Sequence, residues 1–195
     1  VRFGSVLLAA ALATARPLTV QAQPVRWSRS VDLSTWDFHT QNVGVNNTMH
    51  GAVYDTLVEY NSKTFKPEPS LATEWKLIKP TQLRLTLRKG VKFSDGSEFT
   101  ADDAKFSLER AKAKSSNFAV YTQGIDRVEK VDAYTIDIHS DLPNPVLVNQ
   151  LTELRIMSKA WAEKNKSVEP KDIKTKDETF AHRNALGTGP YQPKQ

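Results

Sequence analysis

The sequence predicts a mixed α/β fold, because strands with alternating apolar residues are interleaved with helices that carry an apolar stripe. The clearest strand ends at Leu87, where Leu83, Leu85 and Leu87 alternate with polar residues as in a half-buried strand. The clearest helix follows it and begins after Thr100. No internal repeat or low-complexity tract interrupts the chain, whose length suffices for one hydrophobic core, or for one lobe with an appended subdomain.

Two turns lie between this strand and this helix. Lys89-Gly90 ends the strand, and Asp95-Gly96 predicts a tight turn in which glycine takes a positive φ and aspartate bonds its own backbone. Thr100 is the expected N-cap, and Asp103 completes a capping-box pattern at the positive end of the helix dipole. The apolar stripe of the helix consists of Ala101, Ala104, Leu108 and Ala111.

The segments before this region predict a strand, a helix and an extended linker. Residues 25–31 form the expected first strand, and an amphipathic helix is expected from Asn46. The two prolines of residues 66–69 favour an extended linker, and residues 70–75 then predict a short helix or turn. The apolar face of the amphipathic helix consists of Met49, Ala52, Val53 and Leu57.

The segments after it predict a hairpin, a second helix and a charged surface segment. Apolar residues alternate up to Ile138, and Asp132-Ala133 lies near the turn of the expected antiparallel pair. Pro145 suits the first position of a helix over residues 146–154, since the N–H that proline lacks has no partner there. Residues 163–183 are mostly charged and polar, which predicts a surface excursion. The stripe of the second helix consists of Leu147, Leu151 and Leu154.

Residues 1–22 have the pattern of a secretory signal peptide. Arg2 is followed by an apolar stretch over residues 5–15, and Val20-Gln21-Ala22 offers small residues for cleavage after Ala22. An N-terminal core helix is the alternative interpretation, whereas the stretch is shorter than the roughly 20 residues of a membrane span. The chain contains no cysteine, which excludes disulfides, zinc–thiolate sites and a lipidated cysteine. Export without a lipid anchor predicts a periplasmic protein.

The charge of the chain argues against binding to nucleic acid. The net charge is +5, and removal of Arg2 and Arg16 with the signal leaves 25 Lys and Arg against 22 Asp and Glu. A nucleic-acid binder concentrates basic residues on one face, whereas here both signs are mixed along most of the chain. A mixed pattern of this kind is typical of a solvated surface.

No motif in the sequence indicates catalysis or a metal site. The chain contains no G-x-S-x-G elbow, no H-E-x-x-H and no P-loop, so we expect no enzyme and no cofactor. Gly187-Thr188-Gly189-Pro190 predicts a tight strand crossing, because its proline is incompatible with a phosphate-cradling turn. The histidines form no close pair, so we expect no metal to be bound; they are His39, His50, His139 and His182.

Five segments, in order and with family-like spacing, resemble the peptide and nickel class of substrate-binding proteins of ABC importers. Together they span nearly the whole chain after Gln23, and the spacing carries most of the resemblance. The segments are AVYDTLVEYN at 52–61, PSLATEW at 69–75, the run at 87–110, IDRVEKVDAYTIDI at 125–138 and GTGPY at 187–191.

The resemblance implies a periplasmic-binding-protein-like α/β fold of class II, of the large three-subdomain type. Family members are more than twice as long, so we expect the N-terminal part of lobe 1 with its inserted small subdomain, and not the second lobe. The expected organisation is a signal peptide at 1–22, the start of lobe 1 at 23–60, the inserted subdomain at 61–163, a charged excursion at 164–183 and a return to lobe 1 at 184–195.

The resemblance also implies ligand-binding residues. The loop that carries Trp36, Phe38 and His39 corresponds to the family segment that reaches the ligand cleft, although members commonly have leucine and proline where this chain has Trp36 and Phe38. Trp36 is expected either in the cleft or in the core. Tyr121 and Arg155 lie where similar proteins place an aromatic and a cationic group; Arg155 suits a ligand carboxylate, and a surface salt bridge is the alternative.

The function implied is capture of a small solute, such as a di- or oligopeptide, and its delivery to the permease subunits of an ABC transporter. The protein is expected to be a monomer that meets the membrane only through the permease. Sugars, nickel chelates and opines remain open as cargo, since similar scaffolds host different sites. The alternative is a mildly basic exported module that binds an anionic polymer or surface through the lysines of residues 163–183.

Overall fold

The computed structural model describes residues 32–175 and 177–193, which fall within one compact unit over residues 31–195. The expected signal peptide and the expected first strand at 25–31 lie outside the described residues. Within the described residues, no helix is both long and apolar enough to cross a membrane.

A four-stranded antiparallel sheet in the order β3-β4-β6-β5 forms the centre of this unit. Two hairpins build it, and strands β4 and β6 pair in the middle with Leu85 opposite Ile136. The hairpin predicted around Asp132-Ala133 is confirmed as β5 and β6. The strands are β3 (Ala72–Lys79), β4 (Gln82–Leu87), β5 (Ile125–Asp132) and β6 (Thr135–Ser140).

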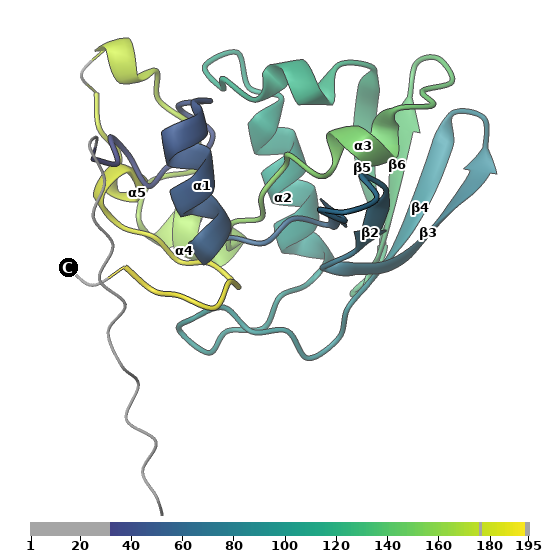
Figure 1. Ribbon diagram of the computed structural model, residues 1–195, viewed down its shortest axis with the longest axis horizontal. Coiled ribbons are helices and arrows are strands. Elements are labelled where there is room, and N and C mark those ends of the chain that lie inside the picture. The colour runs from purple at the N-terminus through teal and green to yellow at the C-terminus, as the bar shows by residue number, and fades with distance from the viewer. Residues whose placement is uncertain (1–31, 176, 194–195) are drawn as a thin grey trace, which may run out of the picture. The chain divides into compact units, whose positions relative to one another are not determined.

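Helix α2 (Ala101–Ala111) packs against this sheet, and a separate two-stranded sheet lies before it in the chain (Figure 1). That small sheet pairs β1 (Val58–Tyr60) with β2 (Pro67–Pro69) in antiparallel fashion. The remaining helical segments are α1 (Gly44–Val53), η1 (Ala119–Thr122), α3 (Leu147–Gln150), α4 (Lys159–Lys164), η2 (Ile173–Thr175) and α5 (Phe180–Arg183).

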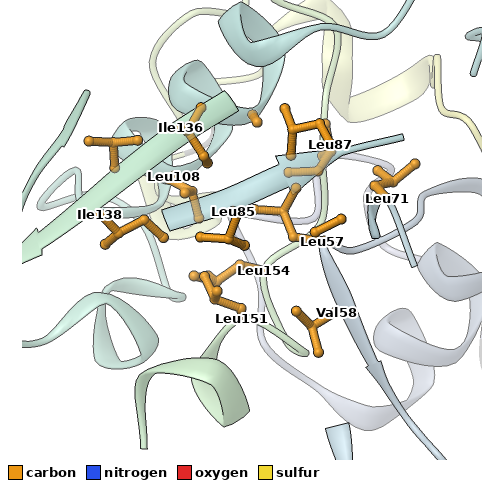
Figure 2. Close-up of a cluster of buried hydrophobic side chains, with 14 of the residues drawn as sticks. Leu57, Val58, Leu71, Leu85, Leu87, Leu108, Ile136, Ile138, Leu151 and Leu154 are labelled. Carbon is orange, nitrogen blue, oxygen red and sulfur yellow. The ribbon is translucent and has the colours of Figure 1, made fainter. Parts of the chain in front are cut away.

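The main core lies between the sheet and helix α2. Leu85 and Leu87 of β4 and Ile136 and Ile138 of β6 meet Leu108 of α2, as Figure 2 shows. The four predicted stripe positions of α2 are fully buried, and full burial of a leucine contributes about 2 kcal/mol. Other members of the same cluster are Leu57, Val58, Leu71, Leu151 and Leu154.

The turn chemistry predicted before α2 is confirmed. Gly90 and Gly96 have φ of 75° and 88°, the left-handed region that favours glycine. The Asp95 Oδ1 accepts a hydrogen bond from the Ser97 N–H at 2.9 Å. Thr100 caps α2 and forms the full capping box with Asp103.

Two predicted elements were wrong in type or length. Residues 70–75 do not form a helix or turn, because Ala72 starts β3 and pairs with Leu87. Here the ladder hydrogen bonds outweigh local helix preference. The helix expected over 146–154 spans only Leu147–Gln150 and continues as turns. Its apolar stripe is nevertheless buried at all three predicted positions.

Two further boundaries differ from expectation. Helix α1 ends at Val53, so Leu57 lies beyond the helix and is buried beside β1 instead. The extended linker at 66–69 is extended as predicted, and its residues 67–69 form strand β2. For α1, apolar spacing located the buried Val53 and Leu57 but not the end of the helix.

The segment 163–183 is packed into the fold more than its charge suggested. Ser167 and Ala181 are fully buried, and His182 is 2% exposed. The expectation of a surface excursion therefore holds only for part of the segment, which includes the exposed lysines 164, 166, 171 and 174.

Gly187 and Gly189 lie against the end of α1. The Gly189 N–H donates to the Val53 carbonyl at 2.9 Å. A Cβ at Gly187 would lie 1.9 Å from that carbonyl oxygen. The predicted crossing is therefore tight, and glycine is required because two backbones touch, but residues 187–190 form no strand and the element they cross is helix α1.

Candidate functional site

The loop of residues 35–40, which was expected to reach a ligand, is anchored by a buried ion pair. The Arg110 Nη1 and Nη2 donate to the two carboxylate oxygens of Asp37 at 2.7 and 2.6 Å. The two side chains are 1% and 0% exposed. The Arg110 Nε donates to the carbonyls of Ser167 and Val168 at 3.2 and 3.0 Å. Helix α2 thus joins the loop to the segment that follows α4.

His39 and Phe38 point into the interior of the described residues. Both are fully buried. The His39 Nδ1 lies 3.0 Å from the Arg110 Nη1, so Nδ1 accepts and the ring is neutral. Burial, and next the Arg110 charge, lower the pKa of His39 well below its usual value. Both side chains therefore support the loop from the interior, and neither has exposed surface that a solute could contact.

Trp36 lies at the boundary between core and solvent. Its side chain is half-buried against a cluster that contains Phe38, Tyr54 and Met157. Its backbone N–H donates to the His182 carbonyl at 2.9 Å, and its carbonyl accepts from the Tyr54 hydroxyl at 3.3 Å. The backbone of Trp36 is therefore fixed while part of its indole remains accessible.

Tyr121 connects to the buried histidine through aromatic packing. Its ring centroid is 5.7 Å from that of Phe118, which is 6.0 Å from that of His39. The row continues from His39 to Phe38 at 4.4 Å and on to Tyr54 at 4.6 Å. Three of the predicted site residues thus belong to one aromatic row, and Phe118, which sequence analysis missed, joins them.

Arg155 follows α3 and lies against helix α1. Its Nη2 donates to the Asn47 carbonyl at 2.8 Å and contacts the position where Gly51 lacks a side chain. Its Nε and Nη1 are buried and have no hydrogen-bond partner among the described residues. Burial lowers the pKa of Arg155, against the opposing effects of Glu153 and Tyr121.

The surface salt bridge weighed for Arg155 is not found. Within residues 32–175 and 177–193, the ion pairs do not include this side chain. An unpaired guanidinium N–H inside a protein is costly, because it has lost its hydration without gaining an acceptor. Two nitrogens of the Arg155 guanidinium are therefore left without an acceptor among the described residues.

A cavity of about 170 Å³ lies beside Arg155. Asp55 and Glu59 also line it, so residues of both charge signs surround the cavity. Asp55 is already engaged, since its Oδ2 accepts from the Thr188 hydroxyl at 2.8 Å. The complete lining is Gly51, Tyr54, Asp55, Thr56, Glu59, Ser70, Thr152 and Arg155.

Two asparagines link Tyr121 and Arg155, and neither was predicted. The Asn42 Nδ2 donates to the Tyr121 hydroxyl at 3.4 Å, and the Asn47 Nδ2 donates to the Asn42 Oδ1 at 2.9 Å. Asn47 is also the residue whose carbonyl accepts from Arg155. Asn42 and Asn47 are five residues apart at the start of a predicted helix, which by itself indicates no site.

The histidines form no metal site within the described part of the chain. No group of three or more His, Cys, Asp or Glu side chains is arranged to hold an ion there. His50 bonds the Thr35 carbonyl through Nε2 at 2.8 Å. His182 bonds Thr179 through Nδ1 at 3.0 Å, and His139 lies 3.2 Å from Glu129. Each of these rings has a local structural partner.

Comparison with known proteins identifies relatives of this chain. The model of a family described as bacterial extracellular solute-binding proteins, family 5 Middle, matches residues 66–195. The chain is similar to the dipeptide-binding protein of Escherichia coli (strain K12), with 29% identity over 168 residues, covering 73% of this chain and 30% of that protein.

Solved structures show the same relationship. The periplasmic binding protein DppA from Helicobacter pylori, in complex with peptide STSA, has a TM-score of 0.68 and 27% identity over 83% of this chain and 34% of its own. The binding protein MoaA from A. tumefaciens R10, in complex with mannopinic acid, has a TM-score of 0.70 and 27% identity over 83% of this chain and 32% of its own. The chain thus spans about a third of the length of these relatives.

Proposed function

The chain belongs to the family 5 bacterial extracellular solute-binding proteins, and on this basis we propose that it supplies one wall of a solute-binding cleft. The whole protein captures a small solute in the periplasm and delivers it to the membrane permease of an ABC importer. It catalyses no reaction. In a two-lobed binding protein, the lobes close over the ligand by hinge motion, and the closed form is recognised by the permease.

The ligand we propose carries a carboxylate, with peptides as the first candidates. The observation that carries this proposal is the Arg155 guanidinium, with two buried nitrogens that lack partners among the described residues. A guanidinium bonds a carboxylate with charge-assisted hydrogen bonds, which are about twice as strong as neutral ones. The relatives named above bind a peptide and mannopinic acid, both of which carry a carboxylate.

The other predicted ligand-binding residues take different parts in this proposal. Tyr121 and the accessible edge of Trp36 contact the solute, because both side chains are only half-buried. Phe38 and His39 support the loop from the interior, where both side chains are fully buried. The Asp37–Arg110 pair fixes the loop on which Trp36, Phe38 and His39 lie.

A thermal-unfolding screen tests this function. The coding sequence that follows Gln195 in frame is added to the chain, and the product is screened with Ser-Thr-Ser-Ala, glutathione, mannopinic acid, nickel and sugars. A carboxylate-bearing solute is expected to raise the melting temperature in a concentration-dependent way, because it binds only the folded state. A rise with sugars or nickel alone would overturn the proposed ligand class.

Arg155→Gln provides the matched variant for this screen. Loss of a charge-assisted hydrogen bond is expected to weaken binding by about ten-fold to one hundred-fold. Arg155→Lys retains the charge but loses the planar fork, so its affinity is expected to lie between the two. Equal affinity of Arg155→Gln and wild type would show that the carboxylate is bound elsewhere.

A further inference from the structure

A directional chain of hydrogen bonds runs from helix α1 to Tyr121. Asn47 lies in α1 and donates through Nδ2 to the Asn42 Oδ1 at 2.9 Å. Asn42 precedes α1 and donates through its own Nδ2 to the Tyr121 hydroxyl oxygen at 3.4 Å. Asn42 thus accepts from Asn47 of α1 through its amide oxygen and donates to Tyr121 through its amide nitrogen.

This direction determines what Tyr121 can offer to a ligand. A tyrosine hydroxyl has one proton to donate and lone pairs to accept with. Because the Asn42 amide N–H already bonds a lone pair of the Tyr121 oxygen, the proton of the Tyr121 hydroxyl is left for another acceptor. Tyr121 is half-buried, with its ring packed on Phe118, so the hydroxyl is held at a defined place.

Arg155 joins the same hydrogen-bond network at Asn47. Its Nη2 donates to the carbonyl of Asn47, whose side chain is the first donor in this series of hydrogen bonds. Tyr121 is close enough to influence the pKa of Arg155. Tyr121 and Arg155 therefore both have donors without an acceptor among the described residues, and Asn47 of α1 is bonded to both Asn42 and Arg155.

We propose that Asn42 and Asn47 are positioning residues that hold Tyr121 as a hydrogen-bond donor, so that Tyr121 and Arg155 together select a solute end rich in acceptor oxygens, namely a carboxylate. This inference rests on the proposed function and deepens it. In this inference Asn42 orients the Tyr121 hydroxyl and does not itself contact the solute.

Asn42→Asp is the informative substitution because it changes the direction of the hydrogen bond while preserving the shape of the side chain. A carboxylate only accepts, so the substituted side chain takes the protons of both Asn47 and Tyr121. The tyrosine then has no proton left for the solute. Tyr121→Phe removes the same donor directly, so the two variants are expected to have the same consequence for binding.

A double-mutant cycle tests this coupling in the chain extended in frame beyond Gln195, with Ser-Thr-Ser-Ala as the probe. Asn42→Asp and Tyr121→Phe are each expected to weaken binding by roughly ten-fold, and the double variant by no more than either alone. Their preference for the peptide over its C-terminal amide is expected to fall. Additive losses, or no loss with Asn42→Asp, would overturn the inference.

Asn149→Asp is the matched control for this cycle. The Asn149 Nδ2 donates to the Tyr60 hydroxyl at 2.9 Å, an exposed pair of the same chemistry elsewhere on the surface. This variant is expected to bind the peptide as wild type does. A ten-fold loss here would show that any added carboxylate weakens binding, which would overturn the interpretation of Asn42→Asp.

Side-chain amide spectra test the donor direction without any ligand. In ¹⁵N-labelled chain, Tyr121→Phe is expected to shift the Asn42 Nδ2 resonance strongly, because that nitrogen loses its acceptor. An unshifted Nδ2 resonance would show that Tyr121 donates to Asn42, and would overturn the inference. If no carboxylate solute binds, the proposed function fails, but this spectrum still shows which of Asn42 and Tyr121 donates the hydrogen bond.

Discussion

At the scale of single residues, the pair of Asp37 and Arg110 determines where the loop at 35–40 lies. Its charges are removed from water almost completely, and Arg110 further bonds two carbonyls of the segment after α4. Such a pair stabilises little relative to an apolar replacement, but the loss of one partner leaves a buried charge uncompensated. The pair therefore specifies the loop position more than it adds net stability.

Asp37→Asn is expected to lower the free energy of unfolding by about 3–5 kcal/mol, because Arg110 then keeps its buried charge without a counter-ion. Urea denaturation monitored by circular dichroism measures the change. The control is Arg183→Gln, which breaks the exposed pair with Glu178 and is expected to have no resolvable effect. Equal urea midpoints for the two variants would contradict the account.

His50 gives the fold a defined dependence on pH. Burial is the main cause that lowers its pKa from 6.5 to about 4, against a hydrogen bond to the Thr35 carbonyl that raises it. The unfolded chain thus binds a proton at a higher pH than the folded chain does. The contribution of His50 to stability is complete above pH 6.5 and is lost as the pH falls toward 4.

His50→Gln, which retains a donor for the Thr35 carbonyl, is expected to flatten this dependence. Between about pH 7 and about pH 4.5, wild type should lose on the order of 2 kcal/mol more unfolding free energy than the variant. Urea midpoints of both proteins across that range provide the measurement. Parallel losses in the two proteins would assign the acid sensitivity to other groups.

At the scale of elements, the start of α2 was predictable because its signals are local. The order Thr100, Asp102, Asp103 is a capping pattern that needs no tertiary contact, and the structure forms it. One contact was not predictable: the Asp103 Oδ1 also accepts from the Lys159 N–H at 2.9 Å, at the start of α4. A carboxylate predicted only as a cap thus joins two helices.

Thr100→Ala and Asp103→Ala separate these two tasks. Thr100→Ala is expected to cost about 1 kcal/mol, the usual value for loss of an N-cap. Asp103→Ala is expected to cost more, because it also leaves the Lys159 N–H without its acceptor. The difference is measured by urea denaturation of the two variants, and a larger effect of Thr100→Ala would contradict the bridging role.

Substitution of Gly187 tests how closely residues 187–189 pack against the end of α1. Gly187→Ala is expected to destabilise by about 3 kcal/mol, because its Cβ would meet the Val53 carbonyl oxygen and the backbone must move. Gly44→Ala is the control, since no atom lies within 4 Å of its Cβ. Thermal unfolding of both variants measures the effect, and similar melting temperatures would show that the crossing is loose.

At the scale of the whole molecule, the pattern of apolar residues predicted the core better than it predicted the ends of elements. Leu151 and Leu154 are buried as expected although their helix is shorter, because burial depends on position and not on helix length. Ala72 begins a strand because it pairs with Leu87 across the β3–β4 hairpin, although residues 70–75 alone suggested a helix or turn. Such pairings carry no local signal.

The candidate site was predictable only where a family segment indicated it. Tyr121 and Arg155 were named in this way, and the structure connects them through Asn42 and Asn47. No pattern indicated those asparagines, since a hydrogen-bond network between distant segments has no fixed spacing in sequence. Arg110 was likewise within a recognised segment without any sign that it pairs with Asp37.

The chain alone presents one wall of the proposed cleft, and it spans about a third of its relatives. In the proposed two-lobed protein, the solute also contacts parts of the protein that this chain does not span. We therefore expect the 195-residue chain to bind weakly or not at all.

The most direct test is calorimetric titration of the same carboxylate solute into two proteins, this chain and the chain extended in frame beyond Gln195. The account predicts tight binding to the extended protein, loss of that affinity in its Arg155→Gln variant, and little or no heat with the 195-residue chain. Equally tight binding by the 195-residue chain, or undiminished affinity without the Arg155 guanidinium, would contradict it.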